Sequence, residues 1–163
     1  MDALTKIVTA ETLATRLDAA RRSGKKVVFT NGCFDILHSG HVRYLAAAGA
    51  TGDLLVVGLN SDVSVRLIKG QKRPIVNQEH RAELLAALDC VDYVVLFDSP
   101  DPLSLIQTLK PDVLVKGADW AEETIVGSDF VKANGGSVAR ISLVPEVSTS
   151  QIIEKILQVY RQD

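Results

Sequence analysis

The sequence of 163 residues contains only two cysteines, five prolines and one methionine, and its apolar runs are short. Cys33 and Cys90 match no zinc or redox spacing, so we expect both to be reduced thiols. The longest apolar runs, such as 54–59 and 94–97, are far too short to span a bilayer. The N-terminal residues carry charges where a signal peptide is apolar, so we expect a cytoplasmic protein with no membrane partner.

The chain also lacks a strong excess of charge of either sign. Eighteen Lys and Arg stand against twenty Asp and Glu, a net charge of −2, which provides no basic surface for nucleic acid. Any polyanion that binds must therefore be small. With 47% apolar and 23% charged residues, the composition is typical of one soluble globular domain, residues 1–163.

Short apolar runs alternate with helical patterns along the chain. We expect five buried strands, at residues 26–30, 54–59, 91–97, 112–116 and 137–142. Helical spacing occurs at 9–23, 41–50, 78–88, 102–109 and 125–133, and a last helix begins at the 148–150 cluster. This alternation predicts an α/β fold: a doubly wound, five-stranded parallel sheet with helices on both faces. Residues 1–24 form a leading helix, and the core occupies 25–160.

Ligands bind such sheets beyond the carboxyl ends of the strands, so the loop after the first strand is the first place to search. It reads Thr30-Asn-Gly-Cys-Phe-Asp-Ile-Leu-His-Ser-Gly-His41. Asn31-Gly32 permits a tight turn, and Gly40 permits close approach to a helix start, where free N–H groups bind anions. His38 and His41 are three residues apart and share one face of a helical turn. The loop matches neither G-x-G-x-x-G nor a P-loop, so it predicts a phosphate site of another kind.

Simpler interpretations of these residues stay open. A single histidine near a helix start is more often a cap or a surface residue than a ligand. The two histidines with Cys33 and Asp35 could bind a metal, although no third ligand has convincing spacing. Phe34 is most simply a core residue that fixes the loop. Cys33 is more simply a small buried residue than a nucleophile, because no base is placed to activate it.

Taken together, residues 32–41 resemble the His-x-Gly-His signature of the nucleotidylyltransferase superfamily, which has a Rossmann-like fold. The longer string 30–42 is similar to the heptose 1-phosphate adenylyltransferase family within it. The likeness extends over about residues 25–160, with further matches in Gly58-Leu-Asn-Ser-Asp62, Arg66-Leu-Ile-Lys-Gly70, His80-Arg81 and Lys116-Gly-Ala-Asp-Trp120.

The resemblance implies transfer of AMP from ATP to D-glycero-D-manno-heptose 1-phosphate, which gives ADP-heptose and pyrophosphate for lipopolysaccharide or another surface glycan. Mg²⁺ would arrive with ATP and not in a protein cage, because the sequence has no carboxylate cluster for one. The resemblance further implies a homodimer, and a separate heptose kinase that supplies the sugar phosphate.

The resemblance also implies roles for individual residues. The catalytic residues are His38, His41 and Lys69. Nucleotide binding falls to three loops: Thr30, Asn31, Gly32, Cys33, Phe34 and Gly40, then Lys116, Gly117 and Asp119, and last Ser148, Thr149 and Ser150. The phosphate of the second substrate is assigned to Asp35, Asn60, Lys72, Arg73 and Arg81. The structural alternatives are a solvated basic run at 69–73, a surface salt bridge for Arg81 and a helix cap at 148–150.

Rival functions also stay open. The chain could be a cytidylyltransferase or another adenylyltransferase of the superfamily, acting on glycerol 3-phosphate, phosphoethanolamine or a flavin. Pro145-Glu146-Val147 weighs against the cytidylyltransferases, which carry an Arg and a Gly just before their Ser-Thr motif. Ala118 and Val147 also differ from residues common in heptose enzymes. From other classes, a nucleotide-binding module without turnover and a metal-binding domain at His38, His41 and Cys33 are the alternatives.

Overall fold

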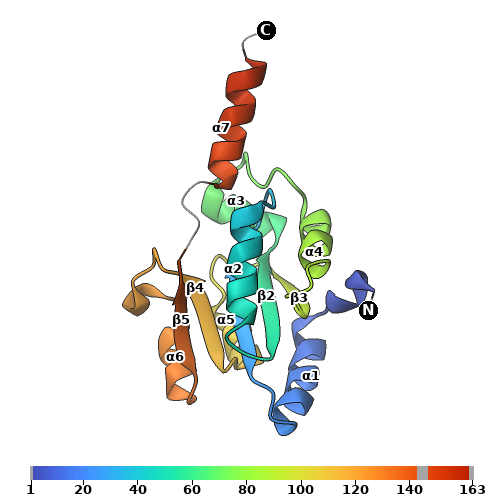
Figure 1. Ribbon diagram of the computed structural model, residues 1–163, viewed down its shortest axis with the longest axis vertical. Coiled ribbons are helices and arrows are strands. Elements are labelled where there is room, and N and C mark those ends of the chain that lie inside the picture. Colours follow the sequence, from blue (N-terminus) through green and yellow to red (C-terminus); the bar gives the residue numbers. More distant parts are fainter. Residues whose placement is uncertain (1, 143–146, 162–163) are drawn as a thin grey trace.

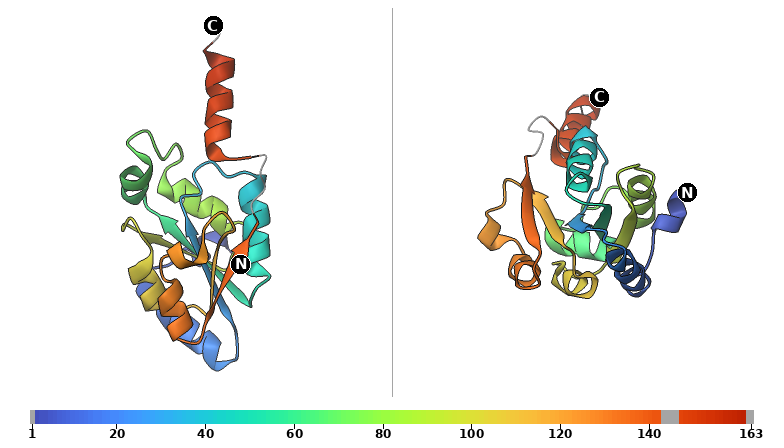
Figure 2. Two further views of the ribbon diagram at one scale, coloured as in Figure 1. Left: turned by 90° about the vertical axis from the view of Figure 1, so that its left-hand side faces the viewer. Right: turned by 60° about the horizontal axis from the view of Figure 1, so that its bottom comes forward.

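The computed structural model describes residues 2–142 and 147–161 and contains one parallel sheet between two layers of helices (Figures 1 and 2). The strands are β1 (Val27–Gly32), β2 (Leu54–Asn60), β3 (Tyr93–Phe97), β4 (Val113–Gly117) and β5 (Ser137–Ile141). The α-helices are α1 (Ala10–Arg22), α2 (Ser39–Gly49), α3 (Asp62–Lys69), α4 (Gln78–Ala86), α5 (Leu103–Leu109), α6 (Ser128–Ala133) and α7 (Thr149–Tyr160). Two 3₁₀ turns, η1 (Ala3–Lys6) and η2 (Glu122–Thr124), complete the described elements.

The sheet confirms the predicted doubly wound topology. Its strand order is β3-β2-β1-β4-β5 and every pairing is parallel. The chain moves outward from β1 to β3, then crosses back to place β4 on the other side of β1. The strand order therefore reverses between β1 and β4, where a crevice for ligands forms beyond the carboxyl ends.

Each face of the sheet has its own apolar core. Helices α2 and α4 pack on one face, through residues such as Leu45 and Leu85, which are fully buried. Helices α1, α5 and α6 pack on the other face, through residues such as Leu17, Ile106 and Val131. The leading helix is thus part of the core, and it is shorter than the expected 1–24, because it begins at Ala10 and ends at Arg22. Gly24, two residues later, adopts a φ of +80°.

The sequence analysis was wrong about the segment after β2. It predicted no helix between the second strand and residue 78, whereas residues 62–69 form α3, with Ser61 as its N-cap and Gly70 at its C-cap. Lys69, which the notion of a solvated basic run would place outside any helix, is thus the last residue of α3. The helix has only eight residues, three of them β-branched apolar residues with low helix propensity, so no long helical stripe marks it. Helix α6 also begins later than expected, at Ser128, because Gly127 adopts a positive φ immediately before it.

Helix α7 extends away from the body of the molecule at the end where the parallel strands finish (Figures 1 and 2). Ser148 is its N-cap and accepts a hydrogen bond from the Gln151 backbone N–H, as the cluster at 148–150 predicted. Much of its apolar surface is exposed, including Ile156 and Leu157. Within the described ranges, no helix combines the length and apolar character needed to cross a membrane.

Candidate active site

The loop between β1 and α2 brings the two predicted histidines into direct contact. His38 is the N-cap residue of α2 and His41 lies in its first turn. The two rings stack with centroids 3.8 Å apart and planes 22° apart. The His38 side chain makes no capping hydrogen bond, which leaves it available to a ligand. The three-residue spacing therefore places both imidazoles at one helix N-terminus, as expected.

Backbone conformation and small residues hold this pair in place. Phe34 adopts a left-handed φ of +43° and is buried, and its ring lies edge-on to His41 at 5.1 Å. A Cβ at position 32 would lie 2.9 Å from the Phe34 ring, so Gly32 is needed for this packing. A Cβ at position 40 would lie 3.0 Å from the His38 ring. The first role of Gly40 is therefore to leave space for this imidazole. A non-glycine residue with a left-handed φ, such as Phe34, is strained, and such strain is typical of functional loops.

Both histidines are held in the neutral form at neutral pH. Burial, with His38 nearby, lowers the pKa of His41 to about 4, and burial also lowers the pKa of His38. Among the described residues, Nδ1 of each ring is buried without a hydrogen-bond partner. Buried polar atoms are normally satisfied, so these two nitrogens indicate a site built for a ligand.

The lowered pKa of His41 predicts how stability changes with pH. Below about pH 6.5 the unfolded chain binds a proton at His41 that the folded protein binds only near pH 4. The free energy of unfolding should therefore fall as pH falls from about 6.5 to 4. Melting temperatures of wild type and His41→Gln measured from about pH 7.5 to 5 test this. We expect a shallower decline in the variant, and equal declines would contradict the assignment.

Two adjoining cavities open at the carboxyl ends of the strands, with volumes of about 590 and 530 Å³. The shared wall consists of the loop after β1, the end of β4 and the start of α7: Asn31, Gly32, Cys33, Phe34, His41, Lys116, Trp120, Ser148 and Thr149. His41 therefore lines both cavities, and one side chain can reach molecules bound in either of them.

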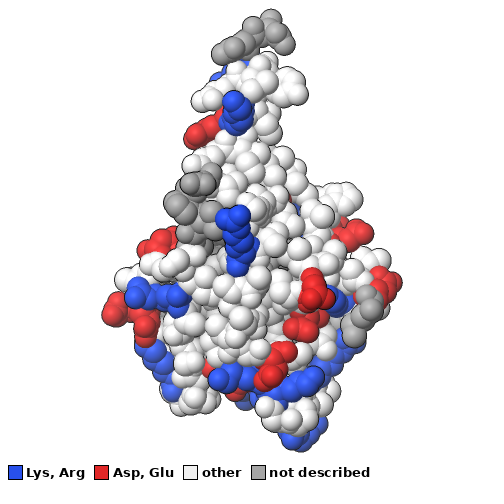
Figure 3. Space-filling model, in the orientation of Figure 1, with Lys and Arg blue, Asp and Glu red and all other residues white. Residues whose placement is uncertain are grey.

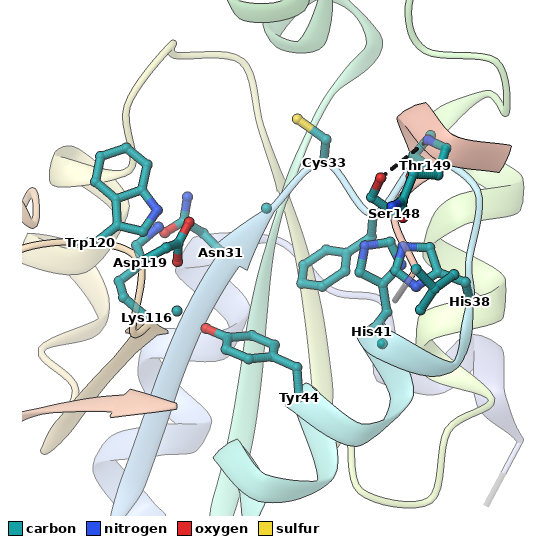
Figure 4. A pocket seen from close by; sticks show the side chains of 16 residues that line it. Asn31, Cys33, His38, His41, Tyr44, Lys116, Asp119, Trp120, Ser148 and Thr149 are labelled. Atoms are coloured by element: carbon teal, nitrogen blue, oxygen red, sulfur yellow. Dashed lines mark hydrogen bonds between the residues drawn. The ribbon is translucent and has the colours of Figure 1, made fainter. Parts of the chain in front are cut away.

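The larger cavity brings together most of the residues predicted for the nucleotide. In Figure 4, His38 and His41 lie on one side beside the start of α7, and Lys116, Asp119 and Trp120 lie on the other. Gly40 and Gly117 also line this cavity. Burial lowers the pKa of Lys116 to about 8, although Cys33 and Asp119 oppose this shift. A cation thus lies opposite the histidine pair.

The second cavity contains two further cations and several of the residues predicted for the other substrate. Lys69 from the end of α3 and Arg73 line it, together with Asp35, Asn60 and Ser150. Ser150 was predicted to bind the nucleotide, but it lines only the second cavity and not the larger one.

Three predicted site residues lie outside both cavities. Thr30 is fully buried, with its hydroxyl 2.8 Å from that of Tyr44. Lys72 is exposed in the segment after α3 and lines neither cavity. Arg81 is buried inside the protein, with four hydrogen bonds to protein groups. The positions of these three side chains therefore do not support direct contact with a substrate.

Several lining residues were not predicted. Tyr44 and Gln151 line the larger cavity, and Asp101 lines the second. Burial raises the pKa of Tyr44 to about 12, so its hydroxyl stays protonated. Asp101 follows β3 and could have been found by searching the loop after every strand. Trp120, which was assigned no role in the site, is 51% exposed and lines both cavities. Pro145 and Glu146 lie outside the described residues.

The described residues contain no group of three or more metal-ligating side chains, so the alternative of a metal site at His38, His41 and Cys33 gains no support. Both cysteines are free, and burial raises the pKa of Cys33, which opposes thiolate formation. The Asp35 carboxylate is occupied by Arg73 and two backbone N–H groups.

The fold and the site together define a doubly wound α/β protein whose ligand crevice has a histidine pair at a helix N-terminus. The family model described as "Cytidylyltransferase-like" matches residues 29–155. The chain belongs to this family, which confirms the predicted membership of the nucleotidylyltransferase superfamily.

Curated relatives include "Bifunctional protein HldE" of Syntrophotalea carbinolica, 57% identical over 96% of this chain and 32% of that protein. The protein of the same name from Geobacter metallireducens is 54% identical over 99% of this chain and 33% of its own length. The chain thus spans about a third of the length of these relatives.

Among solved structures, a lipopolysaccharide core biosynthesis protein from Thermoplasma volcanium matches with a TM-score of 0.64 and 31% identity. The match covers 74% of this chain and 98% of that one. A pantoate-beta-alanine ligase from Francisella tularensis matches with a TM-score of 0.58 over 96% of this chain and 79% of that one. At 15% identity, this second match shows the fold alone.

Proposed function

We propose that the chain is one nucleotidylyltransferase domain, which transfers AMP from Mg-ATP to D-glycero-D-manno-heptose 1-phosphate and gives ADP-heptose and pyrophosphate. The observation that carries the proposal is the stacked pair of His38 and His41 where two cavities adjoin. The family match supports nucleotidyl transfer, and the relatives named HldE and the lipopolysaccharide core biosynthesis protein support the sugar substrate.

In this proposal the larger cavity holds ATP. The neutral imidazoles of His38 and His41 donate hydrogen bonds to the triphosphate, and the N-terminus of α2 adds partial positive charge. These donors stabilise the charge that builds up on the α-phosphate and on the leaving pyrophosphate. Lys116 supplies a positive charge from the opposite wall.

The second cavity then holds the sugar phosphate beside Lys69. A phosphate monoester is largely dianionic at neutral pH, so its oxygen attacks without a base to remove a proton. The new bond joins this oxygen to the α-phosphorus, and the bond to pyrophosphate breaks in line with it. This chemistry requires positioning and charge stabilisation more than covalent participation by the protein. It is compatible with a site whose histidines are neutral and whose Asp35 is fully engaged.

Magnesium belongs to the proposal as a companion of the triphosphate. Bound to phosphate oxygens, it would neutralise part of their charge during transfer. Asp119 is exposed and lines the larger cavity, so in this proposal its carboxylate would accept hydrogen bonds from water bound to the ion.

Release of pyrophosphate from substrate pairs tests the proposed function against its rivals. Purified protein is assayed with Mg-ATP and the heptose 1-phosphate, with CTP and glycerol 3-phosphate, and with ATP alone. Release in the first mixture only is expected. Release from the CTP pair alone would replace the substrate while keeping the reaction class. Tight ATP binding without any release would favour the nucleotide-binding module.

The proposed reaction also requires a source of its substrate, a compartment that contains ATP and a use for its product. A sugar kinase activity must supply the 1-phosphate. Mg-ATP is an intracellular substrate, so we propose that the domain acts in the cytoplasm, and that its product supplies heptose for a surface glycan.

We further propose a homodimer in which a second copy covers α7. The accessible surface is 8970 Å², whereas a monomer of 17.6 kDa is expected to expose about 7,900 Å². The excess is of the size that one partner buries in a standard interface, about 800 Å². Ile156, Leu157 and Tyr160 are exposed and share one face of α7. Figure 3 shows that most of the surface drawn around α7, at the top of the view, is uncharged.

Light scattering after size exclusion tests this interface. We expect wild type to have twice the chain mass of 17.6 kDa, and Ile156→Glu with Leu157→Glu to have the chain mass itself, because the charges would be buried in the dimer. Lys155→Ala, a polar position on the same helix, serves as the matched control. Monomeric wild type at tens of micromolar would contradict the proposal.

A further inference from the structure

Arg81 is the largest fully buried side chain of the described protein, at 1% exposure, although sequence reasoning assigned it to a phosphate. It lies in the first turn of α4, outside both cavities. A guanidinium with no access to water is destabilising unless it is fully hydrogen-bonded and paired. The partners that Arg81 has therefore indicate its role.

Those partners come from four separate segments. Nε donates to the carbonyl of Val76 at 2.9 Å, and one terminal nitrogen donates to the carbonyls of Cys33 at 2.6 Å and Asn60 at 2.9 Å. The other terminal nitrogen pairs with Asp62 at 2.8 Å. A single side chain thus joins four parts of the chain: the loop between β1 and α2 (residues 33–38, the histidine loop), the end of β2, the start of α3 and the segment after α3. Because a guanidinium is a rigid fork of donors, it fixes these groups relative to one another.

Asp35 also connects two of these segments, the histidine loop in which it lies and the segment after α3. Its carboxylate accepts the backbone N–H groups of Ile75 at 2.9 Å and Val76 at 2.8 Å, and it pairs with Arg73 Nε at 2.5 Å. Burial alone would raise the pKa of Asp35, but these two N–H groups and the Arg73 guanidinium hold it below its usual range. Asp35 is 1% exposed, so no lone pair is directed to open solvent.

We propose that Asp35 and Arg81 are positioning residues, which fix the basic segment 69–76 to the histidine loop and do not bind phosphate themselves. The inference rests on the proposed function, because it takes the two cavities as the sites of the two substrates. The backbone of Val76 is then held on both sides: Asp35 accepts from its N–H, and Arg81 donates to its carbonyl.

The expected consequence is a defined distance between Lys69 and the histidine pair. In-line transfer requires the attacking oxygen within about 3.5 Å of the phosphorus, and a displacement of about 1 Å costs on the order of 10²-fold in rate. Loosening the connection should therefore lower kcat and leave the KM for each substrate nearly unchanged. A residue that binds the phosphate directly would instead mainly affect the KM of the sugar phosphate.

The test uses Arg81→Lys and Asp35→Asn, with Arg43→Lys on the exposed surface of α2 as the matched control. Hydrogen exchange is measured by mass spectrometry on the protein without substrates, and kcat and both KM values are measured separately. We expect each of the first two variants to exchange at least tenfold faster in both segments 31–38 and 70–77. We also expect kcat to fall about 100-fold, with KM values within threefold of wild type.

The proposal is overturned if Arg81→Lys exchanges like wild type in both segments, or if it raises the KM of the sugar phosphate tenfold at unchanged kcat. Should Arg81→Lys fail to fold, Asp35→Asn alone carries the same test. Because hydrogen exchange is measured without substrates, its outcome does not depend on the proposed function. Absence of turnover in wild type would overturn the function and leave the exchange result interpretable.

Discussion

His41→Ala is expected to lower kcat by about 10³-fold while the protein stays folded. His41 lies where the two cavities adjoin, and its Nδ1 has no partner among the described residues. The variant loses a donor that acts mainly when charge builds up on the α-phosphate, so the loss should appear in kcat more than in KM. Steady-state release of pyrophosphate with saturating substrates measures it.

His80→Ala is the matched control, because His80 is exposed on α4 and lines neither active-site cavity. It should retain the turnover of wild type. The melting temperature of His41→Ala should not fall, because the alanine removes an imidazole that is buried without a partner for Nδ1. Normal turnover of His41→Ala would refute its assigned role, whatever the substrate proves to be.

Lys69→Met is expected to lower kcat/KM for the sugar phosphate by about 100-fold. Lys69 is exposed at the C-terminus of α3 and lines the second cavity, and Gly70 beside it has open space around its α-carbon. Arg73 lines the same cavity but is already paired with Asp35. Lys69 is therefore the cation of this segment that can contact a phosphate, and charge-assisted bonds of this kind are the strong ones.

Kinetics of three variants with both substrates check this assignment. Lys72→Met should lose far less than Lys69→Met, because Lys72 lines neither cavity. Lys25→Met, at the opposite end of β1, is the control for a lost surface charge. Equal losses at Lys69 and Lys72 would indicate a diffuse electrostatic effect and contradict a specific contact.

The sequence predicted the sheet well because β1, β2 and β4 are short apolar runs that are buried over most of their length. The prediction of five buried strands was wrong for β5, an edge strand whose residues are exposed or only partly buried. Runs such as 54–59 contain only apolar residues and glycine, and all five strands were located within two residues. The histidine pair was also predictable, because two residues three apart at a helix start must share a face.

Side-chain direction was not predictable from the same sequence. Arg81 follows an N-cap in the pattern of an ordinary surface helix, and nothing in the pattern distinguishes a buried guanidinium from an exposed one. Its direction depends on the carbonyls of Cys33 and Asn60, which come from distant parts of the chain. The sequence likewise predicted a last helix from the 148–150 cluster, but not that Ile156 and Leu157 are exposed on it. Long-range contacts decide each of these cases.

The most direct test of the central claim follows the α-phosphate itself. ATP labelled at the α-phosphate is incubated with the protein, Mg²⁺ and D-glycero-D-manno-heptose 1-phosphate, and the products are separated and identified by mass. The account predicts label in a nucleotide-sugar of the mass of ADP-heptose, one pyrophosphate per labelled product, and no label on the protein. Label that stays in ATP, or label attached covalently to the protein, would contradict direct transfer at this site.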